Sequence, residues 1–160
     1  MGALKNDTDV YTTFEGDNTV LTQLVAKSRL SEFRKSFSGM NLIGGINYLA
    51  EQAKTSITEK NPVVKRRTDE EHLLDPDFQL NAFRYREEAI LASAGKRLKR
   101  LIDDGLDSFD AANVAQHHLI NVGQAYIERV VLEQFIKQVE TTEDKGCQKI
   151  LKQLCDLYAL

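Results

Sequence analysis

The sequence contains few cysteines and no long apolar run. Cys147 and Cys155 are the only cysteines among 160 residues. They are too few for a disulfide framework and wrongly spaced for a zinc ribbon or a redox pair, so a reduced, intracellular protein is expected. No apolar run approaches the ~20 residues that a helix needs to cross a bilayer. We therefore expect no membrane span.

A large excess of charge of one sign is also missing, since the formal net charge is −3 at pH 7. Proteins dedicated to nucleic acids or to membrane surfaces rely on a strong excess of Lys and Arg. No nucleic-acid partner is therefore expected. The N-terminal residues lack the charged-then-apolar layout of a secretory signal, and the length is enough for one domain with a hydrophobic core.

The dominant feature that is present is helical periodicity. Apolar residues at mostly helical spacing predict a first helix over about residues 18–37 and a second over about residues 40–58. The apolar side expected for the first helix comprises Leu21, Leu24, Val25, Ala26 and Phe33. Residues 59–75 lack periodicity and carry mixed charge, which predicts a surface loop or linker.

Helix start and stop signals divide the remainder of the chain. Asp75 as N-cap and Pro76 at the first helical position predict the start of a third helix, and Gly105 is expected in the left-handed conformation after its end. Ser108 is the predicted cap of a fourth helix, which is apolar on several sides, as is typical of the centre of a bundle. A break at residues 141–144 precedes the last helix.

No alternation of apolar and polar residues is long enough to predict a strand. The predicted fold class is therefore all-α, an antiparallel bundle of about five helices.

Several residues that could carry chemistry have simpler interpretations. His117 and His118 are adjacent, so they point in different directions on a helix, and no carboxylate or His lies three or four residues away. They predict ordinary packing, and no metal site is expected. Glu128 and Arg129 lie inside the most apolar helix and are interpreted as a structural charge pair or an interface contact.

Glu15 is the one chemically capable side chain in a distinctive setting. It follows Phe14 and precedes Gly16, which lets a ligand approach the backbone, and the Asp17-Asn18-Thr19 run behind it favours the start of a helix. From the residues alone two roles remain open. Glu15 could be a surface carboxylate stabilised by the helix dipole, or it could be a catalytic base.

The twelve residues 10–21, VYTTFEGDNTVL, closely resemble the catalytic-base segment of flavin-dependent acyl-CoA oxidases, members of the acyl-CoA dehydrogenase superfamily. The Glu-Gly-Asp-Asn-Thr-Val string is typical of the oxidases, whereas the wider superfamily carries an aromatic-Glu-Gly-Thr version. The segments 73–98 and 154–160 are similar to the C-terminal helical domain of those oxidases. The resemblance thus covers nearly the whole chain.

The resemblance implies that Glu15 removes the α-proton of a fatty acyl-CoA while a β-hydride passes to FAD. It implies that Phe14 and Gly16 contact the substrate. It places Asp17, Asn18 and Thr19 near the flavin nucleotide.

The resemblance also implies a division of the chain. Residues 1–37 would be the end of the flavin-binding helical domain, and residues 38–160 the C-terminal helical domain. The upstream domains of the family are absent from this sequence, so we expect that the fragment alone neither holds FAD nor oxidises acyl-CoA. A homodimer is implied, peroxisomal in a eukaryote or cytoplasmic in a bacterium.

Two alternatives to an oxidase remain. One is an acyl-CoA dehydrogenase that passes electrons to an electron-transfer flavoprotein. The other is a non-catalytic helical interaction module in which Glu15 is idle.

Overall fold

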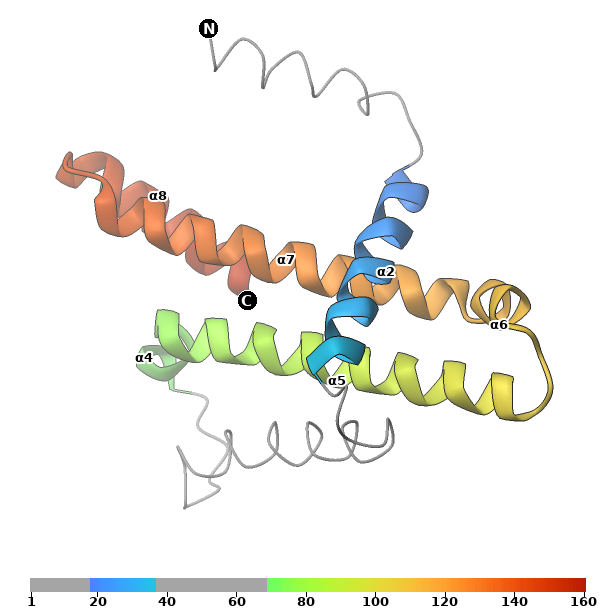
Figure 1. The fold of residues 1–160 in the computed structure, drawn as a ribbon. Coiled ribbons are helices and arrows are strands. Elements are labelled where there is room, and N and C mark those ends of the chain that lie inside the picture. The colour runs from blue at the N-terminus through green and yellow to red at the C-terminus, as the bar shows by residue number, and fades with distance from the viewer. Residues whose placement is uncertain (1–17, 37–68) are drawn as a thin grey trace, which may run out of the picture.

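The computed structural model describes residues 18–36 and 69–160, and within these ranges it contains six helices and no strand (Figure 1). The predicted all-α class is confirmed. The predicted helix over residues 40–58 and most of the predicted loop over 59–75 lie outside the described residues. The helices are α2 (Asn18–Ser36), α4 (Glu70–Leu73), α5 (Pro76–Asp103), α6 (Ser108–Val114), α7 (Gln116–Thr141) and α8 (Lys145–Ala159).

The ends of α5 follow the sequence signals. The Asp75 carboxylate accepts a hydrogen bond from the Asp77 amide at 3.0 Å, directly before Pro76 at the first helical position. Beyond the other end, Gly105 has φ +100°, a conformation that favours glycine. The Leu106 amide donates back to the Leu101 carbonyl at 3.1 Å, which satisfies an otherwise unpaired acceptor at the end of α5.

The predicted loop over residues 59–75 is wrong at its end, where Glu70–Leu73 form the single helical turn α4. Glu70 and Glu71 occupy this turn, where the positive end of the helix dipole favours carboxylates. The His72 ring lies 4.0 Å from the Phe78 ring, centroid to centroid, so the turn packs on the start of α5. Contacts of this kind, within and next to a single turn, produce no repeating pattern of apolar residues in the sequence. Periodicity therefore did not predict α4.

The long helix predicted from Ser108 is two helices, with a break at Ala115. Periodicity missed the break because Ala115 is itself buried and continues the apolar pattern. The Val114 carbonyl accepts a hydrogen bond from the Arg97 guanidinium of α5 at 3.5 Å. This bond gives the carbonyl a partner at the break, where the helix ends. The N-cap is Asp107 and not Ser108, because the Asp107 carboxylate accepts from the amides of the two residues after Ser108.

The predicted break at residues 141–144 is confirmed, and α8 returns beside α7 (Figure 1). The Asp144 carboxylate accepts from the Cys147 amide at 2.7 Å and starts α8. The Gln148 amide group donates to the Val139 carbonyl at 2.9 Å, and the Tyr158 hydroxyl to the Glu128 carbonyl at 3.2 Å. These contacts run in opposite directions along the two helices, so α7 and α8 are antiparallel.

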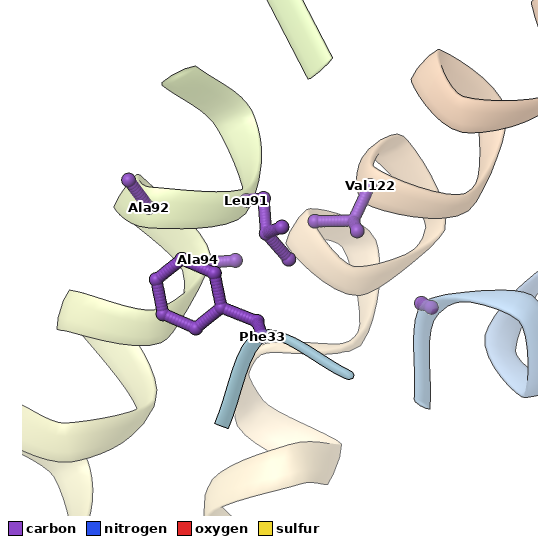
Figure 2. Close-up of a cluster of buried hydrophobic side chains, with 6 residues drawn as sticks. Phe33, Leu91, Ala92, Ala94 and Val122 are labelled. Carbon is purple, nitrogen blue, oxygen red and sulfur yellow. The ribbon is translucent and has the colours of Figure 1, made fainter. Parts of the chain in front are cut away.

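The core forms where α2 lies across the antiparallel pair α5 and α7. Figure 2 shows the Phe33 ring of α2 beside Ala94 and Leu91 of α5, with Val122 of α7 close by. Ala26 of α2 is fully buried in the same cluster. Ala26 of α2 and Ala92 and Ala94 of α5 contribute small side chains to this cluster.

The buried side of α2 differs in part from the predicted apolar side. Ala26 and Phe33 are buried, as expected, but Leu21 and Leu24 are 43% and 57% exposed, and Thr22 is buried in their place. Which residues of α2 are buried depends on the helices that pack against it. The hydropathy of the side chains alone does not identify these residues.

Candidate functional site

Two of the predicted site residues are described by the structure, and they lie at the N-terminal end of α2. Asn18 is the first residue of the helix and is exposed, and Thr19 follows it half-buried. The predicted base Glu15 and its neighbours Phe14, Gly16 and Asp17 lie outside the described residues. Their arrangement therefore stays a prediction, while the structure shows what holds the helix that follows them.

The first turn of α2 is closed by its own side chains. The Thr22 hydroxyl donates to the Asn18 carbonyl at 2.8 Å, a local bond that Thr commonly makes to the preceding turn. No acidic residue occurs in this turn. The turn itself therefore supplies no carboxylate to compensate the partial positive charge at the start of α2.

Helices α2 and α7 approach each other closely at Gly123. Gly123 and Thr22 are both buried. A Cβ at Gly123 would lie 2.6 Å from the Thr22 Cγ2 atom and closer still to the Thr22 carbonyl oxygen. Real Cβ atoms essentially never approach so closely, so glycine is required for the observed position of this turn. We call the contact between Gly123 and Thr22 the notch.

One buried carboxylate connects three helices farther along α2. The side chain of Glu87, on α5, is 4% exposed. Its Oε1 accepts from Arg29 of α2 at 2.6 and 3.0 Å, and its Oε2 accepts from Arg129 of α7 at 2.5 Å. Both carboxylate oxygens are therefore bonded to guanidinium groups, which offsets the cost of removing the charge from water. We call Arg29, Glu87 and Arg129 the clamp.

An aromatic ring and further carboxylates complete the clamp. The guanidinium carbons of Arg29 and Arg129 lie 4.8 and 5.2 Å from the centre of the Tyr126 ring, within the range of cation–π attraction. Arg29 also pairs with Glu32 at 2.5 Å, and Arg129 with Glu133 at 2.6 Å. Each arginine is thereby fixed on more than one side.

The clamp shifts several pKa values. Burial alone would lower the pKa of Arg29 and of Arg129, but hydrogen bonds and charge from Glu87 raise both above the ordinary value. A hydrogen bond from Arg84 and the nearby Arg129 lower the pKa of Glu133. Both shifts favour the charged form of the guanidinium groups.

One feature of the sequence does predict the clamp, although apolar periodicity does not. Glu87 lies four residues after Phe83 and four before Leu91, on the apolar face of its helix. A carboxylate in that position is expected to have a buried cation as partner. No comparable feature of the sequence predicts that position 123 must be glycine, because this requirement comes from contact with a second helix.

The interpretation of Glu128 and Arg129 as a pair with each other needs correction. Arg129 bonds Glu87 and Glu133, and Glu128 bonds Arg86 of α5. Adjacent residues on a helix point about 100° apart, so they reach different partners. Both make ion pairs between helices.

The remaining side chains considered in the sequence do not gather into a site. His117 is exposed and His118 half-buried. Burial, together with nearby Arg97, lowers the pKa of His118. Cys147 and Cys155 are free thiols. Over residues 18–36 and 69–160 no group of three His, Cys, Asp or Glu side chains could hold a metal ion, and no helix is long and apolar enough to cross a membrane.

Comparison with known proteins connects this helical chain to one family. The sequence profile described as acyl-CoA oxidase matches residues 75–160. The chain is 42% identical over 159 residues to acyl-coenzyme A oxidase 2, peroxisomal, of Arabidopsis thaliana, and 35% identical over 160 residues to the acyl-coenzyme A oxidase-like protein of Mus musculus. These matches cover 99% and 97% of this chain but 23% and 24% of the relatives.

The fold is similar to part of a solved structure. Acyl-CoA oxidase 3 from Yarrowia lipolytica matches with a TM-score of 0.68 at 19% sequence identity. The match covers 94% of this chain and 20% of that protein. The helical arrangement is therefore shared, and the chain spans about a quarter of the length of the curated relatives it matches.

Proposed function

The chain belongs to the acyl-CoA oxidase family, and from this membership we propose that it carries the catalytic-base segment of an enzyme that desaturates fatty acyl-CoA. The reaction takes a proton from the α carbon and a hydride from the β carbon, which leaves trans-2-enoyl-CoA. Bound FAD would supply the acceptor for the two electrons, and their transfer to O2 with two protons would give H2O2. The supporting observation is the 42% identity to the Arabidopsis relative over 99% of the chain, a match that extends over the segment around Glu15.

Glu15 is the proposed base. The α-proton of a thioester is weakly acidic, so its removal needs a carboxylate whose pKa is raised by desolvation and which is held within reach of the carbon. We propose that the Glu15 backbone amide donates to the thioester carbonyl, where negative charge develops. Phe14 lines the acyl channel in this proposal, and Gly16 leaves room for the thioester.

FAD supplies the hydride acceptor when bound. The described start of α2 fits a part of such a cofactor, because its first turn has no acidic residue and the positive end of the helix dipole favours an anionic group there. We propose that Asp17, Asn18 and Thr19 contact the flavin nucleotide. The rest of the cofactor site would belong to the remaining length of the enzyme, so we propose that the 160 residues alone neither retain FAD nor turn over acyl-CoA.

The domain division is part of the same proposal. Residues 1–37 would be the end of the flavin-binding helical domain, and residues 38–160 the C-terminal helical domain. In the structure, α2 shares a core with α5 and α7. Helix α2 would thus connect the two domains, so that the position of the C-terminal domain would affect the position of the segment that contains Glu15.

We also propose a homodimer and a compartment. Helix α8 leaves Ile150, Leu154 and Leu157 exposed, and their spacing places them on one face, where a second copy could cover them. The Arabidopsis relative is named as peroxisomal, and a peroxisomal location is proposed for this enzyme if its source is a eukaryote.

The decisive experiment replaces Glu15 by Gln in the full-length oxidase that contains this chain. Gln keeps the size of the side chain but cannot accept the proton, so the anaerobic rate of FAD reduction by fatty acyl-CoA should fall on the order of 10²-fold or more. Glu143→Gln, at an exposed position between α7 and α8, serves as the control and should leave the rate unchanged.

An unchanged rate in Glu15→Gln would contradict the proposal and leave Glu15 idle, as in an interaction module. The electron acceptor is tested separately. Release of one H2O2 per enoyl-CoA with O2 as the sole acceptor supports an oxidase, whereas dependence on an electron-transfer flavoprotein would identify a dehydrogenase.

A further inference from the structure

We propose that Gly123 and Arg29 are positioning residues for the base segment, and this inference rests on the proposed function of Glu15. Neither residue is expected to touch the substrate. They hold α2 on the rest of the bundle at two points, the notch and the clamp. The chain enters α2 directly after Glu15-Gly16-Asp17, so the position of the first turn limits where Glu15 can be.

The notch determines how closely the first turn of α2 approaches α7. Thr22 faces Gly123, and its own hydroxyl is bonded to the Asn18 carbonyl at the start of the helix. A methyl group at Gly123 would meet the Thr22 backbone carbonyl as well as its Cγ2 atom. Rotation of the Thr22 side chain could relieve only the second contact. The first requires that the helix backbone move.

The clamp lies about two turns farther along α2, at Arg29. Two bonds to Glu87 fix its guanidinium, and Tyr126 lies under both this group and that of Arg129. The clamp connects α2 to α5 and α7 at once, and it is mostly buried. Arg29 is therefore a fixed point about which α2 can tilt.

The two anchors together predict a direction of movement. An added methyl group at Gly123 pushes the first turn away from α7 while the clamp holds Arg29 in place. Asn18, one turn before Thr22, then moves outward, and the segment ahead of it moves with it. A displacement of about 1 Å at a reacting group can cost on the order of 10²-fold in rate.

The test uses Gly123→Ala in the full-length oxidase with FAD bound. We expect the anaerobic rate of FAD reduction by fatty acyl-CoA to fall about 10- to 100-fold. The KM for acyl-CoA should change less, because in this proposal only Phe14, Glu15 and Gly16 of the moved segment contact the substrate and the remaining contacts belong to the rest of the enzyme. The bound FAD should keep its visible absorption spectrum.

A second variant approaches the same movement from the other anchor. Arg29→Lys keeps the positive charge but loses the planar fork that bonds Glu87, so α2 is held less firmly. The rate of FAD reduction should again fall more than the KM changes. This variant also tests the inference if Gly123→Ala gives too little folded protein.

Two controls separate position from stability. Leu132 is fully buried in α7 but lies outside the cluster that α2 joins. Leu132→Ala should lower the melting temperature and leave the rate of FAD reduction in the folded enzyme unchanged. Adding Thr22→Ser to Gly123→Ala removes the Cγ2 contact and keeps a hydroxyl, but it leaves the contact with the backbone carbonyl of residue 22, so it should restore little of the lost rate.

The inference is overturned if Gly123→Ala and Arg29→Lys reduce FAD at the unaltered rate, or if Leu132→Ala loses as much rate as they do. It is also overturned if the loss lies entirely in KM. The proposed function fails by a different result, an unchanged rate in Glu15→Gln. If Glu15→Gln is inactive while both anchor variants are normal, only the positioning inference is lost.

Discussion

Glu87 shows how much of the arrangement can depend on one side chain. A carboxylate that is 4% exposed would be strongly unfavourable alone, since removing a charge from water costs several kcal/mol. Here guanidiniums from two other helices, Arg29 and Arg129, bond its two oxygens. The clamp therefore connects α2, α5 and α7 through a single carboxylate.

Glu133, at the edge of this network, makes a pH-dependent contribution that can be measured. Bonds from Arg84 and Arg129 lower its pKa in the folded protein, so the unfolded chain binds the proton more readily. The stabilisation is complete above the unfolded pKa of about 4.3 and is lost as pH falls through the lower folded pKa. Glu133→Gln should therefore reduce the free energy of unfolding by about 1 kcal/mol or less at pH 7.

Urea unfolding of the 160-residue chain between pH 7 and pH 3 tests this prediction, with the difference between wild type and Glu133→Gln expected to shrink as the pH falls below about 4. Glu140→Gln, at an exposed position on the same helix, is the matched control and should change the free energy of unfolding at pH 7 by less than Glu133→Gln does. A constant difference for Glu133→Gln across this range would contradict the assignment.

At the scale of the element, the ends of the helices depend on single polar side chains. Asp75, Asp107 and Asp144 each accept a hydrogen bond from an amide of the first turn that follows. Each bond satisfies a donor that has no partner within the helix. Asp107 and Ser108 are adjacent and both residue types are common N-caps, so the sequence does not decide which of them is the cap.

Asp107→Ala tests the start of α6. The change leaves two first-turn amides without their acceptor and should lower the free energy of unfolding by about 1 kcal/mol. Ser108→Ala is the matched control at the neighbouring position, and it should change stability by less than about 0.5 kcal/mol. Chemical denaturation of both variants measures the two values, and a larger loss for Ser108→Ala would restore Ser108 as the cap.

At the scale of the whole molecule, α8 has one face on α7 and another that is uncovered in this chain. Cys155 is buried toward the bundle, whereas Leu157 is 73% exposed. An apolar face of this kind usually marks an interaction surface. In the proposed enzyme it would be covered by a second copy.

Leu157→Glu in the full-length oxidase tests that surface. Burial of one leucine is worth about 1.5–3 kcal/mol, and a buried unpaired charge adds a further penalty, so the dissociation constant of the dimer should rise at least about tenfold. Light scattering after gel filtration, over a range of concentrations, measures it. Lys149→Glu changes an exposed charge of the same helix and should have no such effect, while an intact dimer in Leu157→Glu would show that α8 is not the interface.

Sequence alone was enough to predict the helical class, the start of α5 and the left-handed glycine after it. These depend on local chemistry, because periodic apolar residues, the carboxylate of Asp75 and the free φ of Gly105 act within a few residues of the chain. The segment around Glu15 also carried the resemblance that the family assignment bears out. The roles proposed for its residues remain predictions.

The packing of the helices in three dimensions determines what covers each of them. It left Leu21 and Leu24 exposed, buried Thr22 and divided the long helix at Ala115. It also showed why position 123 must be glycine. The physical reason is common to all of these: periodicity records which residues are apolar, whereas a close approach or a buried ion pair depends on groups that are distant in sequence and meet only when the helices have packed.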